Sequence, residues 1–453
     1  MSTWARDAVF YHIYPLGLCG APHRNDFAAP PEPRLAQISG WIGHLRRLGV
    51  TALYLGPVFE STTHGYDTAD YYRVDRRLGS NATLAALVAA LHAAGIRVLL
   101  DGVFHHVGRD FWAFRDLQAH REHSAYRDWF AGVDFRRTSP CGDPFAYEDW
   151  NGHFELVKLN VHHPAVRAHL FGAMRQWIAE YRIDGLRLDV ADSLDSGFLR
   201  DLAAFCRREQ QDFWLLGEVL HGDYRRWANP DTLDSVTNYE CYKSLYSSHN
   251  DRNYFEIAYA LERQFGEQGI YRDLPLYAFA DNHDVSRVAS ALRDPAHLYP
   301  LHALLFTMPG VPAIYYGSEW GVSGIKRRDD DWPLRPHLTW PDAERRAPHP
   351  DLAAAIARFA RVRHEIVALR RGTYRQCVVA REQLAFERRH GDEYVVVAVN
   401  AAATPARLDF HAPIADGREF VDLLDPQYRC AVRKSRLCID PVPPCWARIL
   451  LMR

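Results

Sequence analysis

The stretch TLAALVAALHAAGIRVLLDGVF, residues 83–104, contains the two kinds of element that decide the fold of this chain. Its first half places the three leucines and Val88 on one face of a helix, and a glycine then marks the helix end. Its second half is a continuous apolar run, which is typical of a strand buried on both faces. The stretch therefore predicts a helix that leads into a buried parallel strand.

The same pairing of strand and helix recurs along most of the chain. Helical sequence follows each of eight apolar segments predicted as strands, namely VFYHIYP, TALYLGPVF, IRVLLDGVF, DGLRLDV, FWLLGEV, LDSVTNY, PLYAFADNHD and PAIYYGSEW. This repeat favours an α/β fold of the parallel (β/α)8 TIM-barrel type over an open doubly wound sheet. A glycine-rich dinucleotide fingerprint or phosphate-binding loop is missing after the first strand, which argues against nucleotide binding.

Two interruptions of the repeat divide the chain into domains. About fifty residues follow the third strand, where such connections normally have about 2–6 residues, so a small inserted domain is predicted there. Near the C-terminus the helical period gives way to short alternating segments such as EYVVVAVNA and WARILLMR. We predict a barrel from residues 1–107 and 159–371, an inserted domain over 108–158, and an antiparallel β-sandwich over 372–453. The many aromatic residues of the inserted segment could form its own core or stack on sugar rings.

Composition excludes several classes of protein. The 453 residues are 48% hydrophobic and 24% charged, and a net charge of −2 gives no electrostatic reason to expect nucleic acid or an anionic membrane as partner. The start of the chain does not resemble a signal peptide, and no run approaches the length of a membrane span, so we expect a cytoplasmic protein. The eight cysteines form no C-x-x-C pair. They are predicted to be mostly free buried thiols, with a local disulfide between Cys430 and Cys438 left open.

Charged residues stand at the ends of several predicted strands. In GLRLDVAD, residues 185–192, apolar side chains alternate with Arg187 and Asp189. Burying such charges costs several kcal/mol unless they are paired or used. Other predicted strands end in Asp101 and His106, in Glu218, and in His283 with Asp284. In a (β/α)8 barrel these ends meet at the mouth where chemistry takes place.

Several carboxylates and an arginine at one mouth favour glycoside cleavage with retention, which uses two carboxyl groups about 5–5.5 Å apart. We expect Asp189 to be an ionised nucleophile whose pKa is lowered by Arg187, and Glu218 to keep a proton for donation. The alternatives are purely structural salt bridges and a zinc site at His105 and His106. The zinc site lacks a second histidine pair at ligand spacing.

The ordered motifs resemble those of the α-amylase superfamily, family 13 of the glycoside hydrolases. DGVFHH, GLRLDVAD, GEVLH and FADNHD are similar to its four motifs, and LVKLN and HGYDTADYY resemble segments of cyclomaltodextrinases, neopullulanases and maltogenic amylases. The resemblance implies that Asp189 is the nucleophile, Glu218 the acid/base and Asp284 the stabiliser of the transition state. It also implies that the sugar in the −1 subsite is held by Tyr66, Asp67, His106, Arg187 and His283.

The resemblance implies that the protein is a retaining hydrolase of α-1,4-glucosidic bonds. Cyclomaltodextrins and short maltooligosaccharides are the expected substrates, with maltose and glucose as products. A general α-amylase and a transglycosylating α-glucanotransferase stay open, because both use the same carboxylates. A catalytically inactive amylase-like interaction protein is a further alternative, against which the intact set of three carboxylates argues.

Four departures from the family pattern bear on these expectations. His105 stands where the first motif usually has asparagine, a calcium ligand in many relatives, so we expect no cofactor and no calcium requirement there. Leu220 replaces a tryptophan common in the cyclomaltodextrinase group, and Asp192 with Ser193 replaces the Lys-His pair of many starch-degrading α-amylases. About eight residues precede the first strand, so the N-terminal module that many relatives use to dimerise is expected to be absent, and the oligomeric state stays open.

Overall fold

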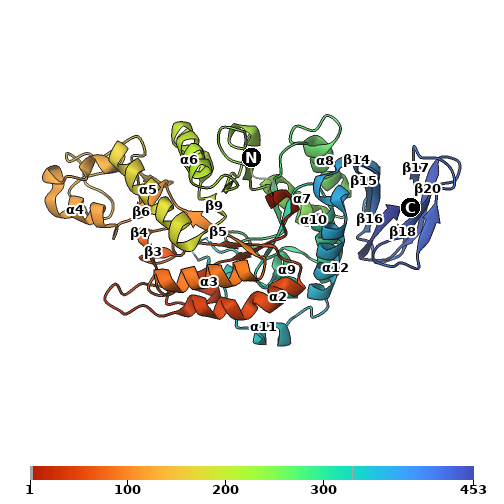
Figure 1. The fold of residues 1–453 in the computed structure, drawn as a ribbon, viewed down its shortest axis with the longest axis horizontal. Helices are drawn as coiled ribbons and strands as arrows, with labels where there is room; N and C mark the ends of the chain where they lie inside the picture. Colours follow the sequence, from red (N-terminus) through yellow and green to blue (C-terminus); the bar gives the residue numbers. More distant parts are fainter. Residues whose placement is uncertain (1–3, 329) are drawn as a thin grey trace.

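The computed structural model describes residues 4–328 and 330–453. Figure 1 shows an elongated molecule whose central barrel lies between a small unit around α4 (Trp112–His120) and a sheet unit that contains the C-terminus.

Eight parallel strands form the barrel within the described residues, and they pair in chain order. A bridge between Thr237 and Tyr277 joins the sixth strand to the seventh and closes the sheet, and the (β/α)8 prediction is therefore confirmed. The second predicted strand is shorter than expected, because Pro57 has no N–H to donate and interrupts the pairing. The barrel strands are β1 (Phe10–Ile13), β2 (Ala52–Leu55), β5 (Arg97–Gly102), β9 (Gly185–Leu188), β10 (Trp214–Gly217), β11 (Ser235–Val236), β12 (Tyr277–Phe279) and β13 (Val311–Tyr315).

Helices surround this sheet. In α3 the side chain of Ser80 accepts a hydrogen bond from Thr83 N–H and Thr83 bonds back to the Ser80 backbone, which fixes the helix start. The predicted apolar face of α3 is buried as expected. The helices are α1 (Pro15–Leu18), α2 (Ile42–Arg47), α3 (Asn81–Ala93), α5 (Pro164–Gln176), α6 (Ser196–Glu209), α7 (Tyr239–Asn250), α8 (Tyr254–Phe265), α9 (Val288–Ala291), α10 (Leu298–Thr307), α11 (Asp342–Arg345), α12 (Leu352–Glu365) and α13 (Val367–Arg371). None of the helices in the described residues is both long enough and apolar enough to cross a membrane.

The inserted domain follows the third barrel strand, as predicted. It holds α4 (Trp112–His120) and an antiparallel sheet of β6 (His106–Gly108), β8 (His153–Lys158) and β7 (Asp149–Trp150). Most of its aromatic rings pack on one another. Phe114, for example, lies 5.2 Å from Phe130 and 5.1 Å from Tyr147 between ring centroids. These rings therefore form a core, whereas the ring of Trp150 faces His106 at 6.0 Å.

A hairpin after the second barrel strand carries part of the barrel mouth. It consists of β3 (Phe59–Ser61) and β4 (Thr68–Val74), which pair antiparallel, and its turn contains Tyr66 and Asp67.

The C-terminal part is an antiparallel sandwich, which confirms that prediction. Apolar side chains such as Val396, Leu408 and Phe410 fill the space between its two sheets. Buried Arg388 donates to the carbonyl of Thr307 at 2.7 Å and so ties the sandwich to the barrel. One sheet contains β14 (Thr373–Val379), β15 (Gln383–His390), β16 (Glu393–Asn400), β21 (Trp446–Met452), β18 (Glu419–Asp422) and β19 (Arg429–Ala431), and the other β17 (Ala406–His411) and β20 (Arg436–Val442).

The cysteines are free, as predicted, and Cys430 and Cys438 are not joined. Burial was overestimated, because only Cys19, Cys206 and Cys241 are buried and the other five are partly exposed.

Candidate active site

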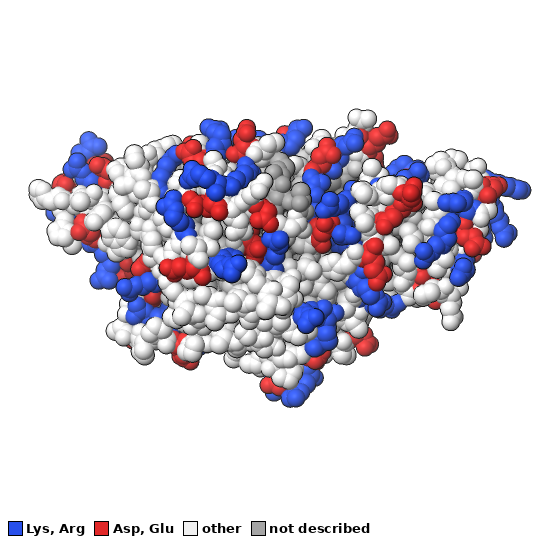
Figure 2. All heavy atoms as spheres, in the orientation of Figure 1, with Lys and Arg blue, Asp and Glu red and all other residues white. Residues whose placement is uncertain are grey.

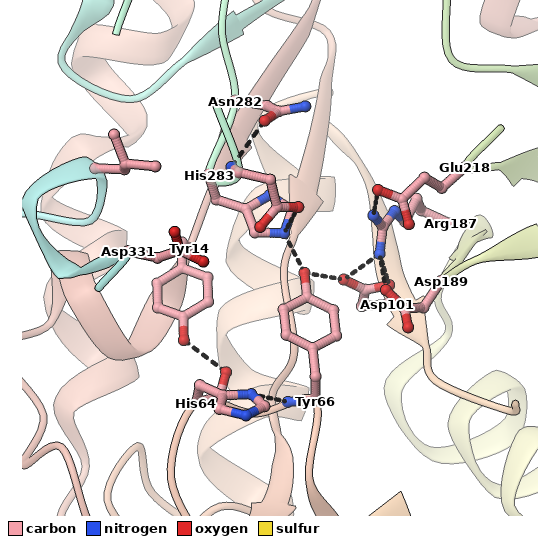
Figure 3. A network of polar contacts seen from close by, with 12 residues as sticks. Tyr14, His64, Tyr66, Asp101, Arg187, Asp189, Glu218, Asn282, His283 and Asp331 are labelled. Carbon is pink, nitrogen blue, oxygen red and sulfur yellow. Dashed lines mark hydrogen bonds and ion pairs between the residues drawn. The ribbon is translucent and has the colours of Figure 1, made fainter. Parts of the chain in front are cut away.

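Arg187 is the centre of a buried cluster of charges at the barrel mouth (Figure 3). Its Nη1 donates to Asp101 at 2.9 and 3.2 Å and to Asp189 at 2.9 Å. Its Nη2 pairs with Glu218 at 2.8 Å. Asp101 lies in β5, and Asp189 and Glu218 follow the last residues of β9 and β10. Because β5, β9 and β10 are neighbours in the barrel, their ends bring three carboxylates to one guanidinium.

Glu218 has a second donor besides the arginine. Its Oε2 accepts from the backbone N–H of Val190 at 3.0 Å. Val190 has a φ of 40°, in the left-handed region that valine rarely adopts, so the chain after Asp189 is strained where it contacts Glu218.

A second polar group follows β12. Nε2 of His283 lies 2.9 Å from Oδ2 of Asp284 and contacts the hydroxyl of Tyr66. The Tyr66 hydroxyl also donates to Asp101 at 3.1 Å, and Tyr54 donates to the same Asp101 oxygen at 2.7 Å. Tyr66 therefore links the His283 group to the Arg187 group (Figure 3).

His106 and Asp67 each present an unpartnered buried atom. Nε2 of His106 lies 3.7 Å from Oδ2 of Asp189 and has no hydrogen-bond partner, and burial lowers the pKa of His106 to about 3. Oδ2 of Asp67 accepts from the backbone and hydroxyl of Thr63 at 2.8 and 2.7 Å. Its Oδ1 has no hydrogen-bond partner and lies 3.9 Å from Nδ1 of His64. The hydrogen bonds of Asp67 are thus made within its own turn. Four other predicted sugar-binding residues contact or lie near the carboxylates at the barrel mouth, namely Tyr66, His106, Arg187 and His283.

Sequence reasoning missed Arg335, which lies in the long loop after β13. Its Nη2 donates to Asp284 at 3.0 Å and to Asp331 at 3.1 Å, and its Nε donates to the carbonyl of His283 at 3.1 Å. The ring of Tyr14, after β1, lies 4.5 Å from the guanidinium. The loop has no periodic pattern, so no signal in the sequence singled out this arginine.

Burial and neighbouring charges raise the pKa values of two carboxyl groups of the site and lower that of a third. Burial raises the pKa of Asp189 well above its ordinary range, and the nearby Glu218 and Asp101 raise it further, which together outweigh Arg187. Arg187 does lower the pKa of Asp189, as expected, but its effect is smaller than that of burial and the neighbouring carboxylates. Burial likewise raises the pKa of Glu218 despite Arg187. Burial also raises the pKa of Asp284, but His283 and Arg335 outweigh it and hold that pKa well below its usual range.

This arrangement can supply both an acid and a nucleophile. Two buried carboxyl groups that share one arginine and both have raised pKa values tend to hold one proton between them. When that proton lies on Glu218, Asp189 is the free carboxylate. Asp284 stays ionised beside them, where a developing positive charge would be stabilised.

The two histidines before the inserted domain, which raised the question of a zinc site, lie close together. Nδ1 of His105 lies 3.3 Å from Nδ1 of His106, and burial lowers the pKa of His105 to about 4. Among residues 4–328 and 330–453, no three or more histidine, cysteine, aspartate or glutamate side chains are grouped so that they could hold a metal ion.

Comparison with known proteins places this geometry in a family. The family described as "Alpha amylase, catalytic domain" matches residues 35–349, and "Neopullulanase-like, C-terminal domain" matches residues 374–448. A cyclomaltodextrinase of Bacillus sp is 32% identical over 88% of this chain and 73% of its own length. Neopullulanase 2 of Thermoactinomyces vulgaris is 32% identical over 93% of this chain and 74% of its own.

A solved structure agrees with these matches. The ligand-free cyclic α-maltosyl-(1→6)-maltose hydrolase from Arthrobacter globiformis superposes with a TM-score of 0.83 at 27% identity, over 99% of this chain and 100% of that chain. The protein is therefore an enzyme of the α-amylase family of glycoside hydrolases, with a neopullulanase-like C-terminal domain.

Proposed function

We propose that the protein is a retaining α-glucan hydrolase that cleaves α-1,4-glucosidic bonds of cyclomaltodextrins and short maltooligosaccharides to maltose and glucose. The observation that carries the proposal is the pair Asp189 and Glu218 on one buried guanidinium, with Asp284 held ionised nearby. The names of the cyclomaltodextrinase and neopullulanase relatives support the substrate class.

In the first step of the proposed mechanism, a carboxylate oxygen of Asp189 attacks the anomeric carbon. The bond from that carbon to the glycosidic oxygen breaks, and Glu218 transfers its proton to the leaving oxygen. Positive charge develops on the sugar ring, and the Asp284 carboxylate stabilises it. A covalent ester between the sugar and Asp189 results.

In the second step Glu218, now a carboxylate, takes a proton from water while the water oxygen attacks the anomeric carbon. The bond to Asp189 breaks, and the product keeps its α configuration. If a sugar hydroxyl replaces water, the same residues perform transglycosylation, which makes this the main competing outcome.

We assign the binding of the sugar in the −1 subsite to five residues. The unpartnered Nε2 of His106 and Oδ1 of Asp67 are positioned to bond hydroxyl groups without giving up another partner. Arg187 and His283 surround the reacting centre, and Tyr66 holds both by its hydroxyl and ring.

The proposal needs no cofactor or metal ion, because side chains carry both the proton transfer and the displacement. It includes a cytoplasmic location and small α-glucans as the partners, with no role for nucleic acid or a membrane. A general α-amylase is the second candidate. We favour small substrates because the inserted domain brings Trp150 to the His106 side of the mouth, where an apolar wall suits a ring or a short chain.

Product analysis with four separate substrates tests the proposal. Cyclomaltodextrin, maltotriose, pullulan and soluble starch are incubated with the enzyme, and products are followed by chromatography. We expect a kcat/KM for cyclomaltodextrin at least ~10-fold above that for starch, a difference of about 1.4 kcal/mol in transition-state binding. Faster degradation of starch at equal mass would favour a general α-amylase. In the incubation with maltotriose, products longer than the substrate would favour transglycosylation. No cleavage of any substrate would favour the inactive interaction protein.

A further inference from the structure

A groove away from the carboxylates of the candidate active site lies between the barrel and the C-terminal sandwich. It has a volume of about 550 Å³ and is lined by Asp251, Arg252, Asn253, Phe255, Arg381 and Glu382. The first four belong to the turn between α7 and α8 and the start of α8, and the last two to the turn between β14 and β15. Its volume lies within the range of about 300–1,000 Å³ that small-molecule sites occupy.

The groove is separated from the catalytic cluster by the length of α7. That helix begins at the mouth, where the Tyr239 hydroxyl accepts a hydrogen bond from Asn282, the residue before His283. It then runs for 12 residues, or about 18 Å, to the α7–α8 turn. Figure 1 shows α8 beside β14 and β15, away from the inserted domain.

The walls of the groove are held in place by backbone contacts. The N–H of Tyr254, the first residue of α8, donates to the carbonyl of Arg381 at 2.8 Å, and Ala380 N–H donates to Gln383 at 2.8 Å within the opposing turn. Arg252 has a φ of 49°, a left-handed conformation, and its side chain lies 3.5 Å from Glu382 across the groove. The side chain of Asn253 makes no capping bond to α8, so its amide is available to a ligand.

The residues that line this groove favour a neutral ligand with many hydroxyl groups. Two carboxylates balance two guanidinium groups, so neither an anion nor a cation is preferred. Every lining side chain is either a planar polar group, which can bond neighbouring hydroxyls, or the ring of Phe255. Figure 2 shows acidic and basic side chains intermingled in this part of the surface, without a patch of one sign.

Two exposed aromatic side chains lie on α8, Phe255 in the lining of the groove and Tyr259 four residues further along the helix. Phe255 is 50% exposed and Tyr259 is 70% exposed, which is unusual for such large apolar side chains. They are four residues apart, so their Cβ atoms are about 5–6 Å apart on the same helix face. Two rings at this spacing form a platform on which successive sugar rings of one chain can stack.

We propose that this groove and the Phe255–Tyr259 platform form a second, non-catalytic binding site for an α-glucan chain. The identity of the sugar as an α-glucan rests on the proposed function. The site holds a neutral oligosaccharide by stacking on the two rings and by hydrogen bonds to Asn253, Arg252 and Glu382. It bridges the barrel and the sandwich, and binding there leaves the barrel mouth open.

Calorimetry with maltoheptaose tests the site in the full chain carrying Asp189→Asn, a change expected to slow turnover by at least ~10³-fold. We expect two binding sites per chain. Adding Phe255→Ala or Tyr259→Ala should weaken one of the two by at least ~10-fold, whereas Phe255→Tyr and Tyr259→Phe keep a ring and should preserve both. A single site before these changes, or two sites unaffected by the alanine variants, would overturn the proposal.

Two further measurements separate this site from its alternatives. In the enzyme with Asp189 intact, Phe255→Ala should leave kcat/KM for maltotriose within about twofold. A larger loss would show that the platform serves the catalytic centre and is not a second site. If light scattering showed that Phe255→Ala dissociates a dimer while glucan binding persists, the platform would be a contact between copies and the proposal would fail. Failure of the proposed function would instead appear as no hydrolysis by the unchanged enzyme.

Discussion

At the scale of single residues, the carboxyl group of Asp189 combines two opposing demands. As the proposed nucleophile it must be ionised, yet burial and its acidic neighbours raise its pKa, so ionisation near pH 7 destabilises the folded state relative to the unfolded chain. For a carboxyl with a raised folded pKa, stability is fully present below the unfolded value of 3.8 and is lost as pH rises through the folded value.

Replacement of Asp189 by asparagine should therefore separate activity from stability. We expect activity to fall by at least ~10³-fold, because the covalent route is lost. We also expect the free energy of unfolding near pH 7 to rise by about 1 kcal/mol, and the gain to disappear at acidic pH. Thermal unfolding at several pH values and initial rates on maltotriose check both. A variant that keeps more than a tenth of the activity would remove Asp189 from its assigned role.

Glu218 provides a prediction about pH. Its raised pKa keeps it protonated above the ordinary 4.5, so kcat/KM should persist above that pH and fall as pH rises through the raised value. Glu218→Gln should cost ~10²–10⁴-fold with maltotriose and much less in the first step with an α-glucosyl fluoride, whose leaving group hardly needs a proton. With the α-glucosyl fluoride as substrate, the fall of kcat/KM at alkaline pH should be absent. Equal losses with both substrates would exclude the acid role.

At the scale of elements, the barrel strands were predictable and the loops were not. Continuous apolar runs followed by helical sequence identify β5 and β9, and the charges after them point to the mouth because parallel strands end on the same side. Motif order singled out Tyr66 and His283, which contact each other beside the carboxylates. The contacts of Arg335 with His283 and Asp284 depend on a loop whose partners are distant in sequence. The pKa of Asp189 depends on how deeply its own carboxyl is buried and on how close Glu218 and Asp101 lie, which the sequence does not reveal.

The loop after β13 is expected to act through Arg335. Arg335→Ala removes a partner of Asp284, so the pKa of Asp284 should rise and the acidic limb of kcat should move to higher pH. We expect kcat to fall by ~10–10²-fold, with partial recovery in Arg335→Lys. Arg327, 69% exposed in the same loop, provides the control, and Arg327→Ala should change neither quantity. An unshifted limb in Arg335→Ala would contradict this role.

At the scale of the whole molecule, the barrel, the inserted domain and the sandwich form two separate sites, the barrel mouth and the groove beside α8. The inserted domain lies on one side of the barrel mouth, and the sandwich lies at the other end of the molecule beside α8 (Figure 1). The division into a barrel, an inserted domain and a sandwich could be predicted from the change of period and one long connection. How the sandwich and α8 together enclose a groove could not be, because Arg381 and Phe255 are far apart in the sequence and meet only through packing.

The central claim is that Asp189 forms a covalent bond to the sugar. Mass spectrometry of the enzyme after incubation with a 5-fluoro-α-glucosyl fluoride tests it most directly. The fluorine at C5 slows both steps, and the anomeric fluoride is a good leaving group that speeds only the first, so the covalent intermediate accumulates. We predict a mass gain of one fluoroglucosyl group, located by peptide fragmentation on Asp189 and absent in Asp189→Asn. Release of fluoride without any adduct and with inversion at the anomeric carbon, or an adduct on Glu218, would contradict the account.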